Sequence, residues 1–387
     1  MKLSRAASGL ETSLTRQLFN KAKQYNDVID LTLGDPDLMP LQSIRNSACN
    51  AIQEGKTRYS MNAGLAMARE AYCKSFEKEY GVHIDSNSEV MLTIGGMGAL
   101  YISMSALIDS GDEVLIIGPY YVNYVQMVNM CGGTPVIVYT ESENNFKINP
   151  DELEKAVTDK TVAIIINSPC NPTGYVIDSA MIDKIADFAK KHDLVVITDE
   201  VYRSLLYDNK KHDSIITRSG MKDRTILIDS MSKRFAMTGY RCGFAVGPEQ
   251  IIAAMTKMQE NIASCAPLPS QYAAIKAYSD CCEDENIKLE FEKRRNYIWS
   301  AVNEIPALSC VKPDGAFYLF VNIEKTGMDS LAFANALLES QHVAVVPGIT
   351  YGKKYDNYVR IAYTVKVEIL REAVNRIAKF TKTLKKG

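Results

Sequence analysis

The chain has 387 residues, of which 47% are hydrophobic and 23% charged, and its formal net charge is −2. It is long enough for more than one core, and it lacks the basic stripe or charge block that binding to nucleic acid or an anionic membrane would need. The N-terminus has no signal-like apolar region, and the apolar runs are too short to cross a bilayer. We therefore expect a cytoplasmic, two-domain protein that acts on small molecules, with neither nucleic acid nor a membrane as partner.

Seven short apolar runs rich in valine and isoleucine alternate with helical patterns over the first three quarters of the chain. These runs predict strands at residues 89–93, 113–118, 134–140, 161–167, 194–200, 225–229 and 242–247. Residues 148–157 and 179–192 predict helices with capping residues at their starts. Such alternation is typical of a sheet that is buried between helices. We therefore expect an α/β fold with a mostly parallel seven-stranded sheet covered by helices.

The pattern changes after about residue 285. Residues 286–305 predict a long charged helix, residues 315–323 and 343–348 predict strands, and a closing helix ends in the sequence KFTKTLKKG. This pattern predicts a second, smaller α+β domain. No low-complexity linker separates the two parts, so we expect them to be closely packed.

Metal ligands are not grouped in the sequence. The nine cysteines include no C-x-x-C pair, only Cys281 and Cys282 are neighbours, and the four histidines lie far apart. Structural and catalytic metal sites of the common types need clustered ligands. We expect free thiols and no metal site.

One glycine-rich turn remains a candidate anion-binding site, although it matches none of the known phosphate-binding motifs in full. The segment AIQEGKT ends like a Walker A loop, but Asn50 stands where that loop needs its first glycine. The segment TIGGMGAL has Gly96 and Gly98 after a strand, but Tyr101 stands where a dinucleotide fingerprint needs its third glycine. What remains is a turn between a strand and a helix, whose free backbone N–H groups favour an anion such as a phosphate.

Polar residues follow three of the predicted strands at their carboxyl ends. The segment NSPCNPTG follows one strand, Asp199 and Tyr202 follow the next, and Ser230 and Lys233 follow the third. Taken singly, each is more often a cap or a turn residue. Ligands of open α/β sheets bind beyond the carboxyl ends of the strands, so together these segments predict one site.

The chemistry of this set favours one cofactor. An amine forms a Schiff base with an aldehyde, a carboxylate keeps a pyridine nitrogen protonated, and hydroxyls with an arginine hold a phosphate. Lys233, Asp199, Ser230 and Arg241 supply these groups. The sequence therefore predicts pyridoxal 5′-phosphate, carried by Lys233.

From DLTLGDPD near the N-terminus to YVRIAYT near the C-terminus, the chain resembles the class I and II aminotransferases, pyridoxal phosphate enzymes of fold type I. The resemblance implies a large cofactor-binding domain at residues 46–285, a small C-terminal domain at residues 286–387, and an N-terminal segment at residues 1–45 that packs on the small domain. It also implies a homodimer with shared active sites.

The matching motifs imply a role for each site residue. Lys233, Asp199 and Tyr202 would be catalytic, with Lys233 forming the Schiff base and Asp199 facing the pyridinium nitrogen. The cofactor-binding residues would be Gly96, Met97, Tyr121, Asn171, Asp199, Tyr202, Ser230, Ser232, Lys233, Arg241 and Tyr59. Tyr59 would cross to the cofactor phosphate of the partner subunit. Gly34 and Arg360 would hold the α-carboxylate of the substrate, and Asn171, which would contact the phenolic oxygen of the cofactor, would also bind the substrate.

The resemblance implies an aminotransferase of the aspartate or aromatic type, which moves an amino group between an L-amino acid and a 2-oxo acid. In one branch of the family a lysine at the position of Met97 reads the distal carboxylate of aspartate, so we expect neutral substrates to be at least as good here. A carbon–sulfur β-lyase is the alternative, because its first steps are the same. A third interpretation, an effector-binding domain of a regulator, would need a helix-turn-helix segment, and little room remains for one before Leu31.

Overall fold

The computed structural model describes residues 2–10, 14–279 and 285–384. Cys281 and Cys282 lie outside these ranges, as do residues 385–387 at the end of the predicted closing helix. Within the described ranges, no helix combines the length and apolar character needed to span a membrane.

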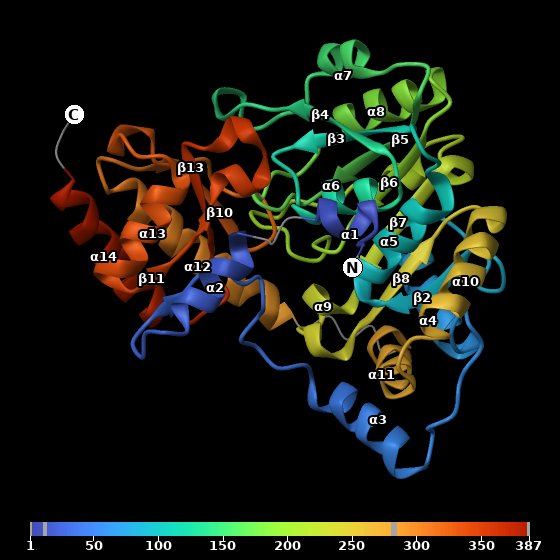
Figure 1. The fold of residues 1–387 in the computed structure, drawn as a ribbon. Coiled ribbons are helices and arrows are strands. Elements are labelled where there is room, and N and C mark those ends of the chain that lie inside the picture. The colour runs from blue at the N-terminus through green and yellow to red at the C-terminus, as the bar shows by residue number, and fades with distance from the viewer. Residues whose placement is uncertain (1, 11–13, 280–284, 385–387) are drawn as a thin grey trace.

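A seven-stranded sheet forms the centre of the larger part of the molecule (Figure 1). In spatial order its strands are β2 (Val90–Ile94), β8 (Cys242–Val246), β7 (Thr225–Ser230), β6 (Val195–Asp199), β5 (Thr161–Asn167), β3 (Glu113–Gly118) and β4 (Thr134–Tyr139). Neighbouring strands are parallel except where β8 pairs with β2 and β7. The predicted mostly parallel seven-stranded sheet is confirmed.

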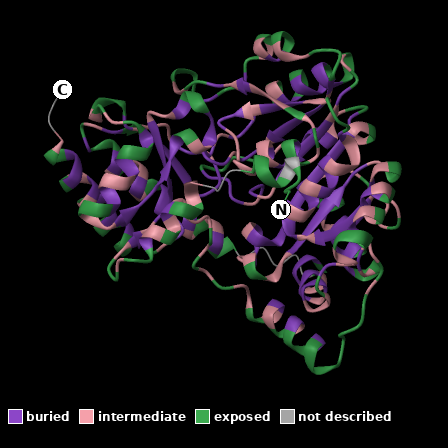
Figure 2. Ribbon diagram, in the orientation of Figure 1, coloured by how far each residue is buried: buried purple, intermediate pink, exposed green. Residues whose placement is uncertain are grey.

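Helices cover both faces of this sheet. One face packs against α5 (Gly95–Leu107), α6 (Asn123–Met130) and α10 (Glu249–Ala263). The other face packs against α3 (Gln42–Gln53), α4 (Ala66–Tyr80), α7 (Pro150–Ala156), α8 (Ser179–Lys191) and α11 (Leu268–Ser279). Successive strand residues alternate between these cores, as Ile164 and Ile165 of β5 do. Buried residues consequently run along nearly the whole length of the strands (Figure 2).

The two predicted helices between strands are α7 and α8, and each begins at a side-chain cap. The side chain of Asn149 accepts from the backbone N–H of Asp151, and that of Asp178 accepts from the N–H of Met181. Each cap satisfies a donor that has no partner within its helix, which fixes where the helix starts.

The smaller part of the molecule is built on a four-stranded antiparallel sheet. Its strands in order are β12 (Val346–Pro347), β13 (Tyr358–Ala362), β10 (Tyr318–Asn322) and β9 (Ser309–Cys310). The helices beside it are α12 (Glu285–Asn303), α13 (Ser330–Gln341) and α14 (Val367–Thr383). These strands and helices share one hydrophobic core.

The predicted strand at residues 343–348 is divided between two sheets. β11 (Val343–Ala344) pairs in parallel with β1 (Ile29–Asp30), whereas β12 pairs with β13. Val343 to Val346 are all fully buried, so the apolar run is continuous even though its hydrogen-bonding partners change. This prediction of a single strand was therefore wrong.

The N-terminal helices lie on different parts of the molecule. α1 (Arg5–Gly9) lies against α6, whereas α2 (Leu14–Ala22) buries Leu18 and Ala22 in the core of the smaller part. Domain boundaries at residues 45 and 285 stay a prediction.

Candidate active site

A cavity of about 440 Å³ lies beyond the carboxyl ends of β5, β6 and β7. Every site residue predicted from the sequence lines it except Tyr59. They are Gly34, Gly96, Met97, Tyr121, Asn171, Asp199, Tyr202, Ser230, Ser232, Lys233, Arg241 and Arg360. Tyr59 is 85% exposed and does not reach this cavity.

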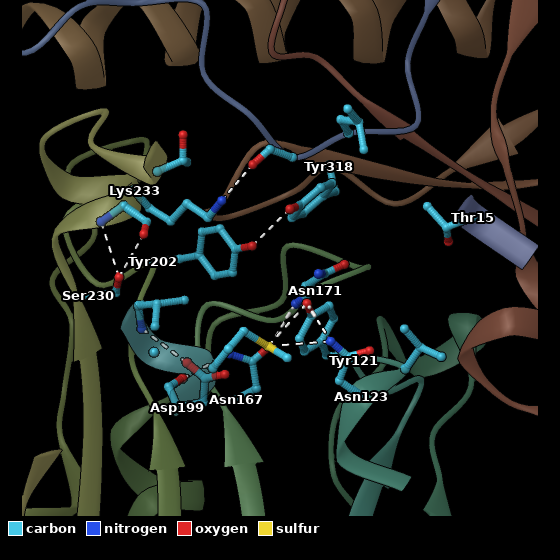
Figure 3. Close-up of a pocket in the computed structure, with 18 of the residues that line it drawn as sticks. Thr15, Tyr121, Asn123, Asn167, Asn171, Asp199, Tyr202, Ser230, Lys233 and Tyr318 are labelled. Atoms are coloured by element: carbon cyan, nitrogen blue, oxygen red, sulfur yellow. Dashed lines mark hydrogen bonds between the residues drawn. The ribbon is translucent and has the colours of Figure 1, made fainter. Parts of the chain in front are cut away.

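Lys233 enters the cavity from α9 (Met231–Arg234), a short helix directly after β7 (Figure 3). Its Nζ donates a hydrogen bond of 2.5 Å to the carbonyl oxygen of Gly34. Burial lowers the pKa of Lys233 to about 8, against the opposing influence of Asp35 and with support from the positive charge of Arg360. A sizeable fraction of the amine is therefore neutral, and nucleophilic, near neutral pH.

Asp199 stands at the end of β6, on the floor of the cavity. Its Oδ2 accepts a hydrogen bond of 2.5 Å from the hydroxyl of Tyr124, and its Oδ1 accepts one of 3.3 Å from the N–H of Val201. The side-chain amide of Asn167 donates to its backbone carbonyl at 2.8 Å. Burial raises the pKa of Asp199 to about 6. A buried carboxylate of this kind gains most from a cationic partner.

Two tyrosines meet beside Lys233. The hydroxyls of Tyr202 and Tyr318 are 2.8 Å apart (Figure 3). Tyr318 also closes the space at Gly34, because a Cβ added there would lie 2.0 Å from its hydroxyl oxygen. Glycine is favoured at this position by the lack of space and not by its backbone conformation, because Gly34 has no positive φ.

Arg360 of β13 is a buried cation that faces the cavity. Its Nη1 donates to Oδ1 of Asn171 at 3.1 Å, and its Nη2 donates to the carbonyl of Thr32. Its guanidinium carbon lies 4.5 Å from the ring centre of Tyr318 and 5.4 Å from that of Tyr351. Its Nε is buried and has no partner, and no carboxylate of the described residues pairs with it. The arrangement fits a carboxylate ligand, which a guanidinium binds through two parallel hydrogen bonds.

Donors for a phosphate gather at the start of α5. Gly95 lies close to Arg241, whose Nη2 would be 2.6 Å from a Cβ placed there. The hydroxyl of Ser230 donates to that of Ser232 at 2.9 Å and accepts from its N–H at 3.1 Å. A helix N-terminus, a guanidinium and two hydroxyls form the kind of donor set that binds phosphate.

The donor set as a whole fits pyridoxal phosphate. It offers an amine of lowered pKa, a buried carboxylate that forms no ion pair with any described residue, a phosphate-binding helix start and a buried arginine for a substrate carboxylate. Together with the fold, these groups define a pyridoxal phosphate-dependent enzyme.

The structure adds residues to the cavity that the sequence did not single out. Asn123 donates from Nδ2 to the Tyr121 hydroxyl at 3.0 Å and to Sδ of Met97 at 3.3 Å. Tyr318 lies in an apolar run that looked like ordinary core. Thr15, Arg16 and Phe19 reach the cavity from α2. No local motif marks these positions, because they reach the site only through long-range packing.

Comparisons with known proteins identify the family of the chain. The family model described as aminotransferase class I and II matches residues 26–377. An aspartate aminotransferase of Pyrococcus abyssi is 44% identical over 382 residues, covering 98% of each chain. Aromatic-amino-acid aminotransferase 2 of Thermococcus litoralis is 40% identical over 388 residues, covering 100% of each chain. The crystal structure of an aromatic aminotransferase from Pyrococcus horikoshii OT3 superimposes with a TM-score of 0.89 at 43% identity, covering 94% of this chain and 98% of that one.

The chain therefore belongs to the class I and II aminotransferase family. It is a pyridoxal phosphate-dependent enzyme that moves an amino group between an L-amino acid and a 2-oxo acid.

Proposed function

We propose that this aminotransferase is a cytoplasmic homodimer and uses neutral aromatic or medium aliphatic amino acids at least as well as aspartate. The wall around Met97 carries the proposal of substrate preference. Sδ of Met97 accepts from the hydroxyl of Tyr121 at 3.5 Å and from the amide of Asn123 at 3.3 Å, so this wall is polarizable and uncharged. A carboxylate buried against it without a partner would cost several kcal/mol.

In the proposed reaction, bound pyridoxal phosphate supplies an electrophilic carbon and an electron sink that stabilises negative charge at the substrate Cα. Lys233 carries the cofactor at rest and then takes up the proton that leaves Cα. Its lowered pKa suits that role, since an amine titrating near 8 both accepts and returns a proton near neutral pH.

The other site residues hold and orient the substrate and the cofactor. Arg360 and Asn171, which contact each other, bind the α-carboxylate. The carbonyl of Gly34 accepts a hydrogen bond from Lys233 and so keeps the lysine beside the bound carboxylate. Asp199 would supply a fixed negative charge beside the protonated pyridine nitrogen, and Tyr202 would contact the phenolic oxygen. The phosphate would be held by Ser230, Ser232, Arg241 and the N–H groups of Gly96 and Met97, and the ring of Tyr121 would stack on the cofactor. Ser232 acts through its contact with Ser230.

Exposed apolar side chains support the homodimer. Ile52, Tyr59, Met61 and Met67, within sixteen residues of one another, are each more than half exposed. A second copy of the chain would cover such a surface. It would also bring the exposed Tyr59 toward the partner's cofactor phosphate, which is the role that the family resemblance implies.

A substrate panel tests the proposed function. The purified holoenzyme is given phenylalanine, methionine, alanine or aspartate with 2-oxoglutarate, and kcat/KM is measured for each. We expect phenylalanine or methionine to equal or exceed aspartate. A clear preference for aspartate would contradict the proposal. Cysteine is given alone in parallel, without an acceptor, and ammonia and sulfide are assayed, because a β-lyase releases both from cysteine and a transaminase releases neither.

A further inference from the structure

Within the described residues, four basic side chains line the cavity. They are Arg16, Lys233, Arg241 and Arg360. In the proposed function Lys233 carries the cofactor, Arg241 binds its phosphate and Arg360 binds the α-carboxylate. Arg16 is left without a role, although an unpaired cation at the wall of a substrate cavity attracts anionic groups.

Arg16 stands on a fixed backbone. It belongs to the first turn of α2, and Leu18 and Ala22 of the same helix are buried in the core of the smaller part of the molecule. Its neighbour Thr15 faces the cavity from the side away from Lys233 (Figure 3). Arg16 therefore lines the cavity from α2, whereas the cofactor lysine enters it from α9.

The guanidinium of Arg16 is available for a ligand. The side chain is exposed, and its guanidinium carbon lies 5.3 Å from the ring centre of Phe19, another cavity residue. Such a contact is weak at an exposed site. No carboxylate in the part of the chain that the structure describes forms an ion pair with Arg16.

We propose that Arg16 binds the distal carboxylate of a dicarboxylic substrate, such as 2-oxoglutarate, while Arg360 binds its α-carboxylate. This inference rests on the proposed function, in which Arg360 has that role. It gives the cavity two ways of accepting a side chain: an uncharged one against Met97 and Tyr121, and a carboxylate at Arg16. A neutral substrate would make no use of the charge of Arg16.

Ligands that differ by one carboxylate test the proposal. Succinate and propionate are titrated into the holoenzyme by calorimetry, with Arg16→Gln compared to the wild type. Hydrogen bonds to a charged partner contribute about 1.5 to 3 kcal/mol, so succinate should bind roughly 10- to 100-fold more weakly to the variant. Propionate binding should change less than about twofold, because that ligand has no distal carboxylate for the pair. Arg16→Lys should keep part of the succinate affinity, since it retains the charge but loses the bidentate geometry.

Lys23→Gln is the matched control. Lys23 is exposed, and its Nζ lies 4.4 Å from the centre of the same Phe19 ring, but it does not line the cavity. The Lys23→Gln substitution removes one positive charge from α2, as Arg16→Gln does. Succinate affinity should nevertheless stay within about twofold of the wild type. Both changes are at exposed positions, and the melting temperature checks that both variants fold.

Two outcomes would overturn the proposal. Arg16→Gln could weaken succinate binding no more than Lys23→Gln does, or it could weaken succinate and propionate equally. A wild type that prefers aspartate to every neutral donor would contradict the proposed substrate range instead, and would leave the comparison of succinate with propionate intact. kcat/KM for 2-oxoglutarate against phenylpyruvate, with methionine as donor, should follow the same pattern in Arg16→Gln.

Discussion

The hydroxyl of Tyr124 donates a hydrogen bond of 2.5 Å to Oδ2 of Asp199 at the floor of the cavity. Among the described residues, the carboxylate receives one further hydrogen bond, the longer one from the N–H of Val201. Burial outweighs both and raises the pKa of Asp199 from 3.8 to about 6. The carboxylate is thus held in place at a cost to the stability of the chain without cofactor, as is common for functional groups.

Asp199→Asn should stabilise the cofactor-free protein near pH 8. A carboxyl whose pKa is raised by folding binds more protons in the native state, so its contribution to the free energy of unfolding falls between about pH 4 and 6 and stays low above that range. The amide removes this loss, which amounts to at most roughly 3 kcal/mol. Calorimetry of both apoproteins at pH 8 and pH 5 measures it. The gain should shrink at pH 5, and a variant that is less stable at pH 8 would contradict the expectation.

The reaction of the apoenzyme with pyridoxal phosphate should accelerate with pH and level off above about pH 8, because the neutral amine of Lys233 is the nucleophile. Stopped-flow absorbance follows the rate. Arg360→Met should move the midpoint to higher pH, since Arg360 disfavours the charged amine, and Asp35→Asn should move it to lower pH. Shifts in the same direction for both variants would show that these charges do not act on Lys233.

Gly34→Ala should impair substrate binding through Tyr318. The new Cβ would collide with the Tyr318 hydroxyl, and overpacking of this kind typically costs about 1 to 3 kcal/mol. We expect a higher KM and a lower melting temperature, with partial recovery when Tyr318→Phe is added. Gly239→Ala is the control, because a Cβ there meets no atom within 4 Å. Equal changes in KM and melting temperature for Gly34→Ala and Gly239→Ala would contradict the proposed collision with Tyr318.

Much of this site could be predicted from the sequence because its residues follow strands. Asp199 and Lys233 stand directly beyond β6 and β7, and parallel strands bring their carboxyl ends to one edge. Arg16 could not be found this way, since its position depends on how α2 packs on the smaller part of the molecule. The division of residues 343–348 between two sheets was missed for a similar reason, as burial on both sides hides a change of pairing partner.

Tyr59 stays a prediction that mixed dimers would test. Tyr59→Phe should weaken cofactor retention roughly 10- to 100-fold, the effect of one lost hydrogen bond to a charged acceptor. Coexpression of Tyr59→Phe chains with Lys233→Ala chains should then yield heterodimers with one intact site, provided that Tyr59 acts across the interface. Activity and cofactor content of the isolated heterodimer measure this. A monomeric protein, or heterodimers without any intact site, would contradict the shared-site arrangement.

The position of the cofactor is the most direct test of the site. The holoenzyme is reduced with borohydride and digested, and the peptide that carries the pyridoxyl group is identified by mass spectrometry. We predict the group on Lys233, within the peptide that follows β7. Its recovery on any other lysine, such as the exposed Lys56, would contradict the assignment of this cavity as the active site.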